Sequence, residues 1–202
     1  MATEKSSLRS EMVNSVISDL NEDFSVAMED VVSSFSEPER SIILGAAGST
    51  APFPPIPSQP GGQHSAGTFS EFSKVDFSSG TLTITVTNNW PIDIMNLQIQ
   101  ILNSDDSPVG TVNYLSVPTG ASVADNIDLA GQTMDNAISA NIISIESPGA
   151  PFPSMVPIDL ADDIAINIAT SDLTLTGGSA VFPSGDVVDE TVSVDMLSLI
   201  HI

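Results

Sequence analysis

GTLTITVTNNWPIDIMNLQIQIL, residues 80–102, is the stretch that decides the fold class of this chain. Its first half alternates strictly between threonine and the apolar residues Leu82, Ile84 and Val86. After Asn-Asn-Trp-Pro at 88–91, the alternation resumes between Asn or Gln and the apolar residues Leu97, Ile99 and Ile101. Period-2 alternation in β-branched residues predicts antiparallel strands with one buried and one solvated face.

The apolar positions of this stretch change parity near Met95-Asn96, because Ile92 and Ile94 are even-numbered and Leu97 is odd-numbered. A second change of parity occurs at Ile142-Ile143. Such a change predicts a β-bulge, or a strand that crosses from one sheet to another. We expect the chain to turn a corner between two sheets around Trp90-Pro91.

Short apolar segments separated by turn residues continue to the end of the chain. The predicted strands are 68–77, 81–87, 92–102, 109–115, 121–129, 136–145, 158–160, 164–170, 173–182 and 189–195. Turn residues at 78–80, 103–108, 118–120 and 147–149 separate several of them, and Gly177-Gly178 interrupts another. This spacing predicts a mainly β protein, with an antiparallel β-sandwich of Greek-key or immunoglobulin-like type over residues 68–196.

The first third of the chain has a different pattern. Apolar residues recur at three- and four-residue steps from Ser7 to Phe35, which predicts an amphipathic helical segment over residues 1–36. Residues 37–67 contain six prolines and the Gly61-Gly62 pair, which favours a linker, with a possible short strand at 41–47. The segments APFPPIP (51–57) and APFPSMVP (150–157) are similar to each other.

The charge of the chain is one-sided: 26 acidic residues stand against four basic ones, a formal net charge of −22. A surface of this kind does not bind nucleic acid and disfavours anionic membranes. It suits solvation at high ionic strength, which is the simplest interpretation, or contact with divalent cations or basic partners. The chain has no cysteine, and therefore no disulfide or thiolate site. No apolar run is long enough to span a bilayer, and residues 1–15 show no signal-peptide pattern.

Calcium is the cofactor that the acidic clusters could hold, because hard cations take several carboxylate and carbonyl oxygens. The candidate ligands are Asp105, Asp106, Asp162, Asp163, Asp186, Asp189 and Glu190. None of these clusters matches the spaced Asp-x-Asp-x-Asp-Gly loop. Aspartate is also common in turns because it hydrogen bonds to nearby backbone, and this is the alternative role for these residues.

Catalytic chemistry has little support in the sequence. The chain has two histidines, His64 in a Gly/Ser-rich segment and His201 near the end. No nucleophile elbow, phosphate loop or zinc-protease motif occurs. We therefore expect a protein that is not an enzyme.

The order of motifs from Thr81 to Leu129 resembles the water-stress and hypersensitive-response domain of group 2 late-embryogenesis-abundant proteins. The resemblance rests on Asn88-Asn89-Trp90-Pro91, Val109-Gly110 and Pro118-Thr119-Gly120. Residues 68–196 also resemble uncharacterised β-rich envelope proteins of Bacteroidota-type marine bacteria, which implies a cell-envelope or extracellular location. Leu197–Ile202 resembles translated transposase-adapter DNA from sequencing libraries, so we expect the natural sequence of this fragment to end near Met196.

The sequence leaves two function hypotheses. The first is a non-catalytic structural or interaction module of a bacterial envelope or surface protein. The second is a module that binds lipid or another apolar ligand between its sheets. An apolar cavity in the structure would favour the second hypothesis, and a filled aliphatic core would count against it.

Overall fold

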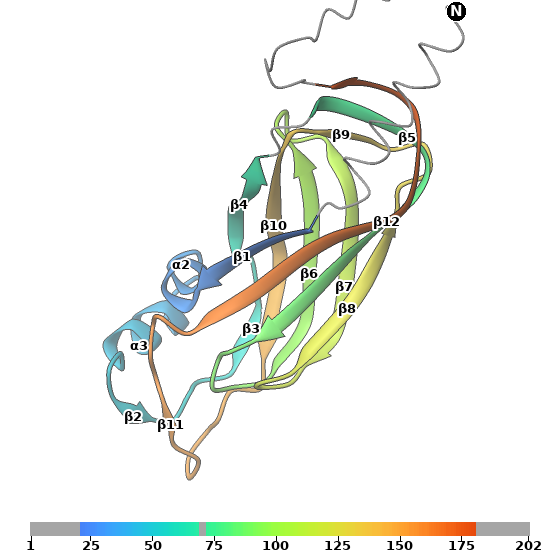
Figure 1. The fold of residues 1–202 in the computed structure, drawn as a ribbon. Coiled ribbons are helices and arrows are strands. Elements are labelled where there is room, and N and C mark those ends of the chain that lie inside the picture. The colour runs from blue at the N-terminus through green and yellow to red at the C-terminus, as the bar shows by residue number, and fades with distance from the viewer. Residues whose placement is uncertain (1–20, 69–71, 181–202) are drawn as a thin grey trace, which may run out of the picture.

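The computed structural model describes residues 21–68 and 72–180, which form two packed antiparallel sheets, a short ribbon and two short helices (Figure 1). The first sheet contains β1 (Asn21–Ala27), β5 (Phe72–Asn88), β8 (Ser122–Asp128), β9 (Thr133–Asp135) and β12 (Asp163–Ala180). The second contains β3 (Ile56–Gln59), β4 (Gly62–Thr68), β6 (Ile94–Asn103), β7 (Pro108–Val117) and β10 (Ala137–Ser147). The ribbon pairs β2 (Thr50–Ala51) with β11 (Val156–Pro157), and the helices are α2 (Met28–Ser33) and α3 (Glu39–Gly45). The predicted antiparallel β-sandwich is confirmed.

The strand order is that of a jelly roll. One sheet has the strand order β1-β12-β5-β8. The other has the order β10-β6-β7, and β3 and β4 both pair with the edge of β10 that faces away from β6. Consecutive strands repeatedly change sheet, as in the paired Greek keys of that architecture. The two sheets therefore depend on each other for burial of their inner faces.

The core lies between the sheets and consists of aliphatic side chains. In β5 the residues Leu82, Ile84 and Val86 are fully buried, whereas the intervening threonines are half-buried on the outer face. Isoleucines of β6, β10 and β12 belong to the same buried cluster. The alternation in residues 80–102 is thus the pattern of a strand with one face in the core.

The chain crosses between the sheets just after Asn88, at the predicted corner. β5 belongs to the first sheet and β6 to the second. Trp90, in the segment that connects these two strands, is fully buried. The buried side chain of Asn88 holds the corner: its Nδ2 donates to the carbonyl oxygens of Ile92 and Val117, both at 2.9 Å. Its Oδ1 accepts the backbone N–H of Trp90, also at 2.9 Å.

Both changes of parity coincide with β-bulges, which is the first of the two predicted explanations. Between Met95 and Gln98, β6 advances by three residues while β10 advances by two, and Asn96 within this bulge has φ of +44°. Between Ile142 and Ser144, β10 advances by two residues against one on β6, so Ile143 is the extra residue there. Each bulge restores the inward direction of the isoleucines that follow it.

The predicted helix over residues 1–36 is wrong for residues 21–27, which form strand β1. Phe24 and Val26 face inward, Asp23 and Ser25 face outward, and β1 pairs along its whole length with β12. Phe24 and Met28 also match a helical spacing, so the local pattern fits a helix as well as a strand. Pairing with the distant strand β12 decides in favour of the strand. Helix α2 lies within the predicted segment, and residues 7–20 lie outside the described residues.

The predicted linker over residues 37–67 is also wrong. Residues 41–47, expected as a possible strand, fall largely in helix α3, and β3 and β4 follow. Both strands pair with the outer side of β10, an edge position at which proline is tolerated. The sandwich therefore begins, within the described part of the chain, at residue 21 and not at 68.

Two predicted interruptions in strands are absorbed as irregularities of pairing. β5 runs without a break through Ser78-Ser79-Gly80, where a turn was predicted, and β12 continues through Gly177-Gly178. The register of β12 against β5 shifts at several points between Ser171 and Gly177. A shift of register allows the apolar positions to change parity without ending the strand. The predicted strand at 189–195 and the tail at 197–202 lie outside the described residues.

Candidate interaction surface at the proline-rich end

One end of the sandwich differs in composition from the rest of the molecule. We call residues 41–57 and 147–158 the proline-rich end. These two segments contain eight of the 14 prolines of the chain and none of its Asp, Glu, Lys or Arg residues. They include most of α3, both strands of the ribbon and the loop between β10 and β11, which lie at the end of the sandwich opposite β9 (Figure 1).

The two similar sequences noted above meet at this end. Phe53 and Ala150 form an antiparallel bridge, in which the N–H of each residue donates to the carbonyl oxygen of the other at 3.0 and 2.9 Å. The ribbon continues the contact, with Val156 opposite Ala51. The two Ala-Pro-Phe-Pro segments are thus fixed against each other by backbone hydrogen bonds.

Gly149 allows this close approach. Its φ is +65°, and a Cβ atom built there would lie 2.5 Å from the carbonyl oxygens of both Phe53 and Pro54. A larger residue would have to push the two segments apart and adopt an unfavourable backbone conformation.

Large apolar side chains are exposed at this end. Phe152 is 81% exposed, Met155 51%, Ile42 49% and Leu44 36%. Phe152 lies inside a tight turn that is closed by the hydrogen bond from Ser154 N to the carbonyl oxygen of Pro151 at 3.0 Å. Two further large apolar residues are comparably exposed in the described ranges, Leu115 and Ile143, and both lie elsewhere. Sequence reasoning interpreted residues 41–57 as part of a linker and residues 147–149 as a turn within the sandwich, and it missed the surface. The signal that could have revealed it is the long uncharged run in a strongly acidic chain.

The predicted calcium ligands are not gathered by the described part of the structure. Asp105 and Asp106 lie in the β6–β7 turn, whereas Asp162 and Asp163 lie at the start of β12 near the other end of β6. A ten-residue strand such as β6 spans about 33 Å. Within residues 21–68 and 72–180, no three acidic or histidine side chains come together as a metal site. Asp186, Asp189 and Glu190 lie outside the described residues.

Two of these aspartates have roles in turns. The carboxylate of Asp105 accepts hydrogen bonds from the hydroxyl and the N–H of Ser107, and these bonds lower the pKa of Asp105. Asp106 occupies the left-handed region, with φ of +63°, and accepts a hydrogen bond from Gln63 Nε2 at 3.2 Å. This is the backbone role that aspartate often has in turns.

The acidic residues at the start of β12 repel one another. The pKa of Asp162 is raised, first by partial burial and then by the charges of Asp159 and Asp163. Asp163 Oδ1 accepts a hydrogen bond from Asn89 Nδ2 at 2.6 Å, which ties β12 to the corner after β5.

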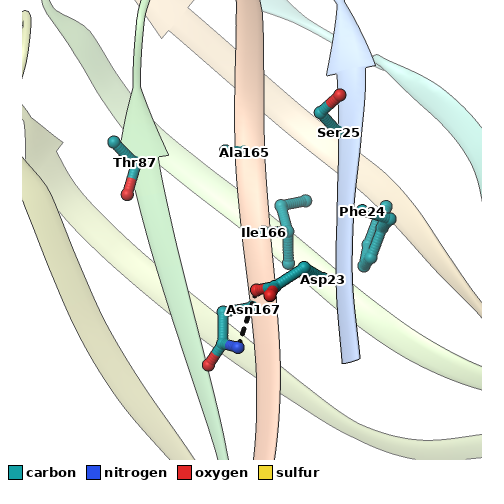
Figure 2. Close-up of a pocket in the computed structure, with 7 residues that line it drawn as sticks. All are labelled: Asp23, Phe24, Ser25, Thr87, Ala165, Ile166 and Asn167. Atoms are coloured by element: carbon teal, nitrogen blue, oxygen red, sulfur yellow. Dashed lines mark hydrogen bonds between the residues drawn. The ribbon is translucent and has the colours of Figure 1, made fainter. Parts of the chain in front are cut away.

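A shallow depression of about 360 Å³ lies on the outer face of the first sheet (Figure 2). Ala165 lies within it, and Asp23, Ser25, Thr87 and Asn167 are among the residues that line it. Asn167 Nδ2 donates to Asp23 Oδ1 at 2.8 Å, so these two polar groups already satisfy each other.

Two other depressions, of about 510 and 200 Å³, lie on the outer face of the second sheet, beside the β6–β7 turn and the Asn96 bulge respectively. None of the three lies between the sheets. His64, the one histidine of the described residues, contacts the carbonyl oxygen of Gly61 through Nε2 at 2.9 Å.

Comparisons with known proteins give only distant similarity. No protein-family model and no curated protein matches the chain. Among solved structures, it is similar to the VP2 subviral particle of infectious bursal disease virus, at 10% identity and a TM-score of 0.29, over 81% of this chain and 39% of that one. The Gx strain of the same virus gives 12% identity and a TM-score of 0.25, again over 81% and 39%. The chain thus spans about two fifths of these proteins, and no function follows from the likeness. Within the described residues, no helix is long and apolar enough to cross a membrane.

Proposed function

We propose that this chain is a non-catalytic interaction module of a bacterial envelope or surface protein, and that it contacts other macromolecules through its proline-rich end. The observation that carries the proposal is the exposure of Phe152 and Met155 on an uncharged end of a chain whose net charge is −22. Exposed apolar side chains that gather at one place in a soluble protein commonly mark a binding surface. The bacterial envelope location rests on the resemblance of residues 68–196 to envelope proteins.

The backbone hydrogen bonds of the proline-rich end support a binding role. Prolines, the Phe53–Ala150 bridge and the turn around Phe152 hold the apolar side chains on a fixed backbone. A surface that is already ordered loses less conformational entropy when it binds. The loop is therefore suited to contact a partner without first folding.

The alternative, an apolar ligand held between the sheets, gains no support from the geometry. Aliphatic side chains of both sheets form one continuous buried cluster, and the depressions described above open on outer faces. The non-catalytic part of the proposal draws on the position of His64, whose Nε2 already contacts a backbone carbonyl.

Site-specific photo-cross-linking tests the proposal. A photoreactive phenylalanine analogue replaces Phe152 in the full chain, which is produced in intact bacterial cells, and a matched chain carries the analogue at Leu115. Leu115 is 80% exposed on β7, away from the proline-rich end, and therefore controls for exposure alone. We expect discrete adducts from position 152 and few from position 115. Equal yields at the two positions, or no adduct at either, would contradict the proposal.

A further inference from the structure

We infer that the proline-rich end is a contact between two copies of this chain, in which Phe152 and Met155 of each copy pack against the same end of the other. This inference rests on the proposed function, because it names the partner of the proposed surface.

Charge selects this end for self-association. Each copy carries a formal charge of −22, and one of the basic residues, Arg40, is already paired with Glu37 at 2.7 Å. Most faces of two copies would therefore bring carboxylates together, and like charges repel at short range. The residues of the proline-rich end carry no charge, and the nearest carboxylates, Glu39 at the start of α3 and Asp159 after Ile158, lie at its margins, so a contact centred on Phe152 and Met155 does not require a carboxylate at its middle.

The surface is also of the kind that can match itself. A two-fold contact uses the same patch on both copies, so the patch must be complementary to its own chemistry. An uncharged apolar patch satisfies this condition, whereas an acidic patch does not. A basic partner would be attracted to the acidic faces and would have no electrostatic reason to bind at the one end that lacks charge.

The size of the surface sets the expected strength. A contact that covered both the loop and α3 would bury on the order of 400 Å² per copy from their four exposed apolar side chains, with phenylalanine the largest contributor. The neighbouring prolines add to this area. The total for two copies then approaches the roughly 1,000 Å² at the lower limit of specific interfaces. We therefore expect a reversible dimer that forms as concentration rises.

Sedimentation equilibrium of the full chain tests the inference. The wild type should pass from monomer to dimer between micromolar and millimolar concentration, and added salt should strengthen association because it screens the repulsion between acidic copies. At a concentration at which half of the wild type is dimeric, F152S should remain monomeric. The control L115S removes an equally exposed apolar side chain from β7 and should dimerise like the wild type. Circular dichroism checks that both variants fold.

A wild type that stays monomeric at every concentration and salt level would overturn the inference, and so would an F152S chain that dimerises normally. Flotation with neutral phosphatidylcholine vesicles adds a further arm. Binding of monomers to vesicles that is lost in F152S would show that lipid covers this end, which refutes the second copy but leaves the proposed interaction surface standing. Failure of the proposed function is recognised separately, as equal cross-linking from positions 152 and 115.

Discussion

Replacement of Asn88 by alanine should strongly destabilise the protein, because this side chain links the corner between the sheets to the end of β7 through three backbone groups. It donates to the carbonyl oxygens of Ile92 and Val117 and accepts the N–H of Trp90, each at 2.9 Å, and it is fully buried. Alanine would leave two carbonyl oxygens and one N–H without these partners in a place that water does not reach.

The magnitude follows from the three hydrogen bonds. Each contributes about 1 kcal/mol net, and each buried group left unsatisfied costs about 1–3 kcal/mol before the structure relaxes. We therefore expect a loss of about 3–5 kcal/mol, a large part of the roughly 5–15 kcal/mol that stabilises a typical domain. Asn88→Asp should be at least as harmful at neutral pH, because a carboxylate would then face two carbonyl oxygens.

Urea denaturation followed by circular dichroism measures the effect as a change in free energy of unfolding. The neighbour Asn89 is the matched control: it is exposed and makes one side-chain hydrogen bond, to Asp163, so Asn89→Ala should cost less than about 1 kcal/mol. A loss below about 1 kcal/mol for Asn88→Ala, or equal losses for the two variants, would refute the role assigned to Asn88.

Three further perturbations test the energetics of the sandwich. The pKa of Asp162 is raised in the folded state, so ionisation of this carboxyl group favours unfolding. Asp162→Asn should therefore raise the melting temperature at neutral pH. Calorimetry at a pH low enough to protonate the carboxyl group should show no such gain. Tyr114, the one tyrosine of the chain, donates its hydroxyl hydrogen to the carbonyl oxygen of Ile84 at 2.6 Å, and burial raises its pKa. Tyrosinate absorbance should therefore appear in alkali only together with loss of the circular dichroism signal. Tyrosinate that forms while the protein is still folded would contradict the burial of Tyr114. Tyr114→Phe should cost about 1 kcal/mol in urea denaturation. Gly149→Ala should cost more than about 2 kcal/mol of unfolding free energy, because the position has a positive φ and a new Cβ would contact backbone. The control Gly120→Ala has a positive φ but open space around it, and should cost only about 1 kcal/mol. Equal losses would show that the close approach at Gly149 is unimportant.

Local alternation was sufficient to predict the strands of the core, because residues such as Ile84 and Ile99 lie on strands with one buried face and one solvated face. The same period-2 rule located both bulges, since a change of parity within a strand has few other physical explanations. It also placed the corner near Trp90, where proline and two asparagines interrupt the pattern.

The pattern failed where long-range pairing decides the structure. Residues 21–27 satisfy a helical and a strand spacing equally well, and β12, which pairs with them, lies about 140 residues further along the chain. The prolines of residues 52–60 predict extended backbone correctly, but extended backbone describes a linker and an edge strand alike. Only the position of β10, with a free side for β3 and β4, distinguishes the two.

The candidate surface was hidden from the sequence for a related reason, which the two Ala-Pro-Phe-Pro segments make clear. Phe53 is fully buried and Phe152 is 81% exposed, although their immediate neighbours are identical. The antiparallel bridge places Ala150, and not Phe152, opposite Phe53, and the chain then turns at Phe152 itself. Phe53 consequently joins the core cluster, whereas Phe152 has no contact of comparable kind within the fold. Exposure alone does not separate Phe152 from Leu115, so the proposal of a partner at the proline-rich end rests on the additional absence of charged residues around Phe152 and Met155 in these segments.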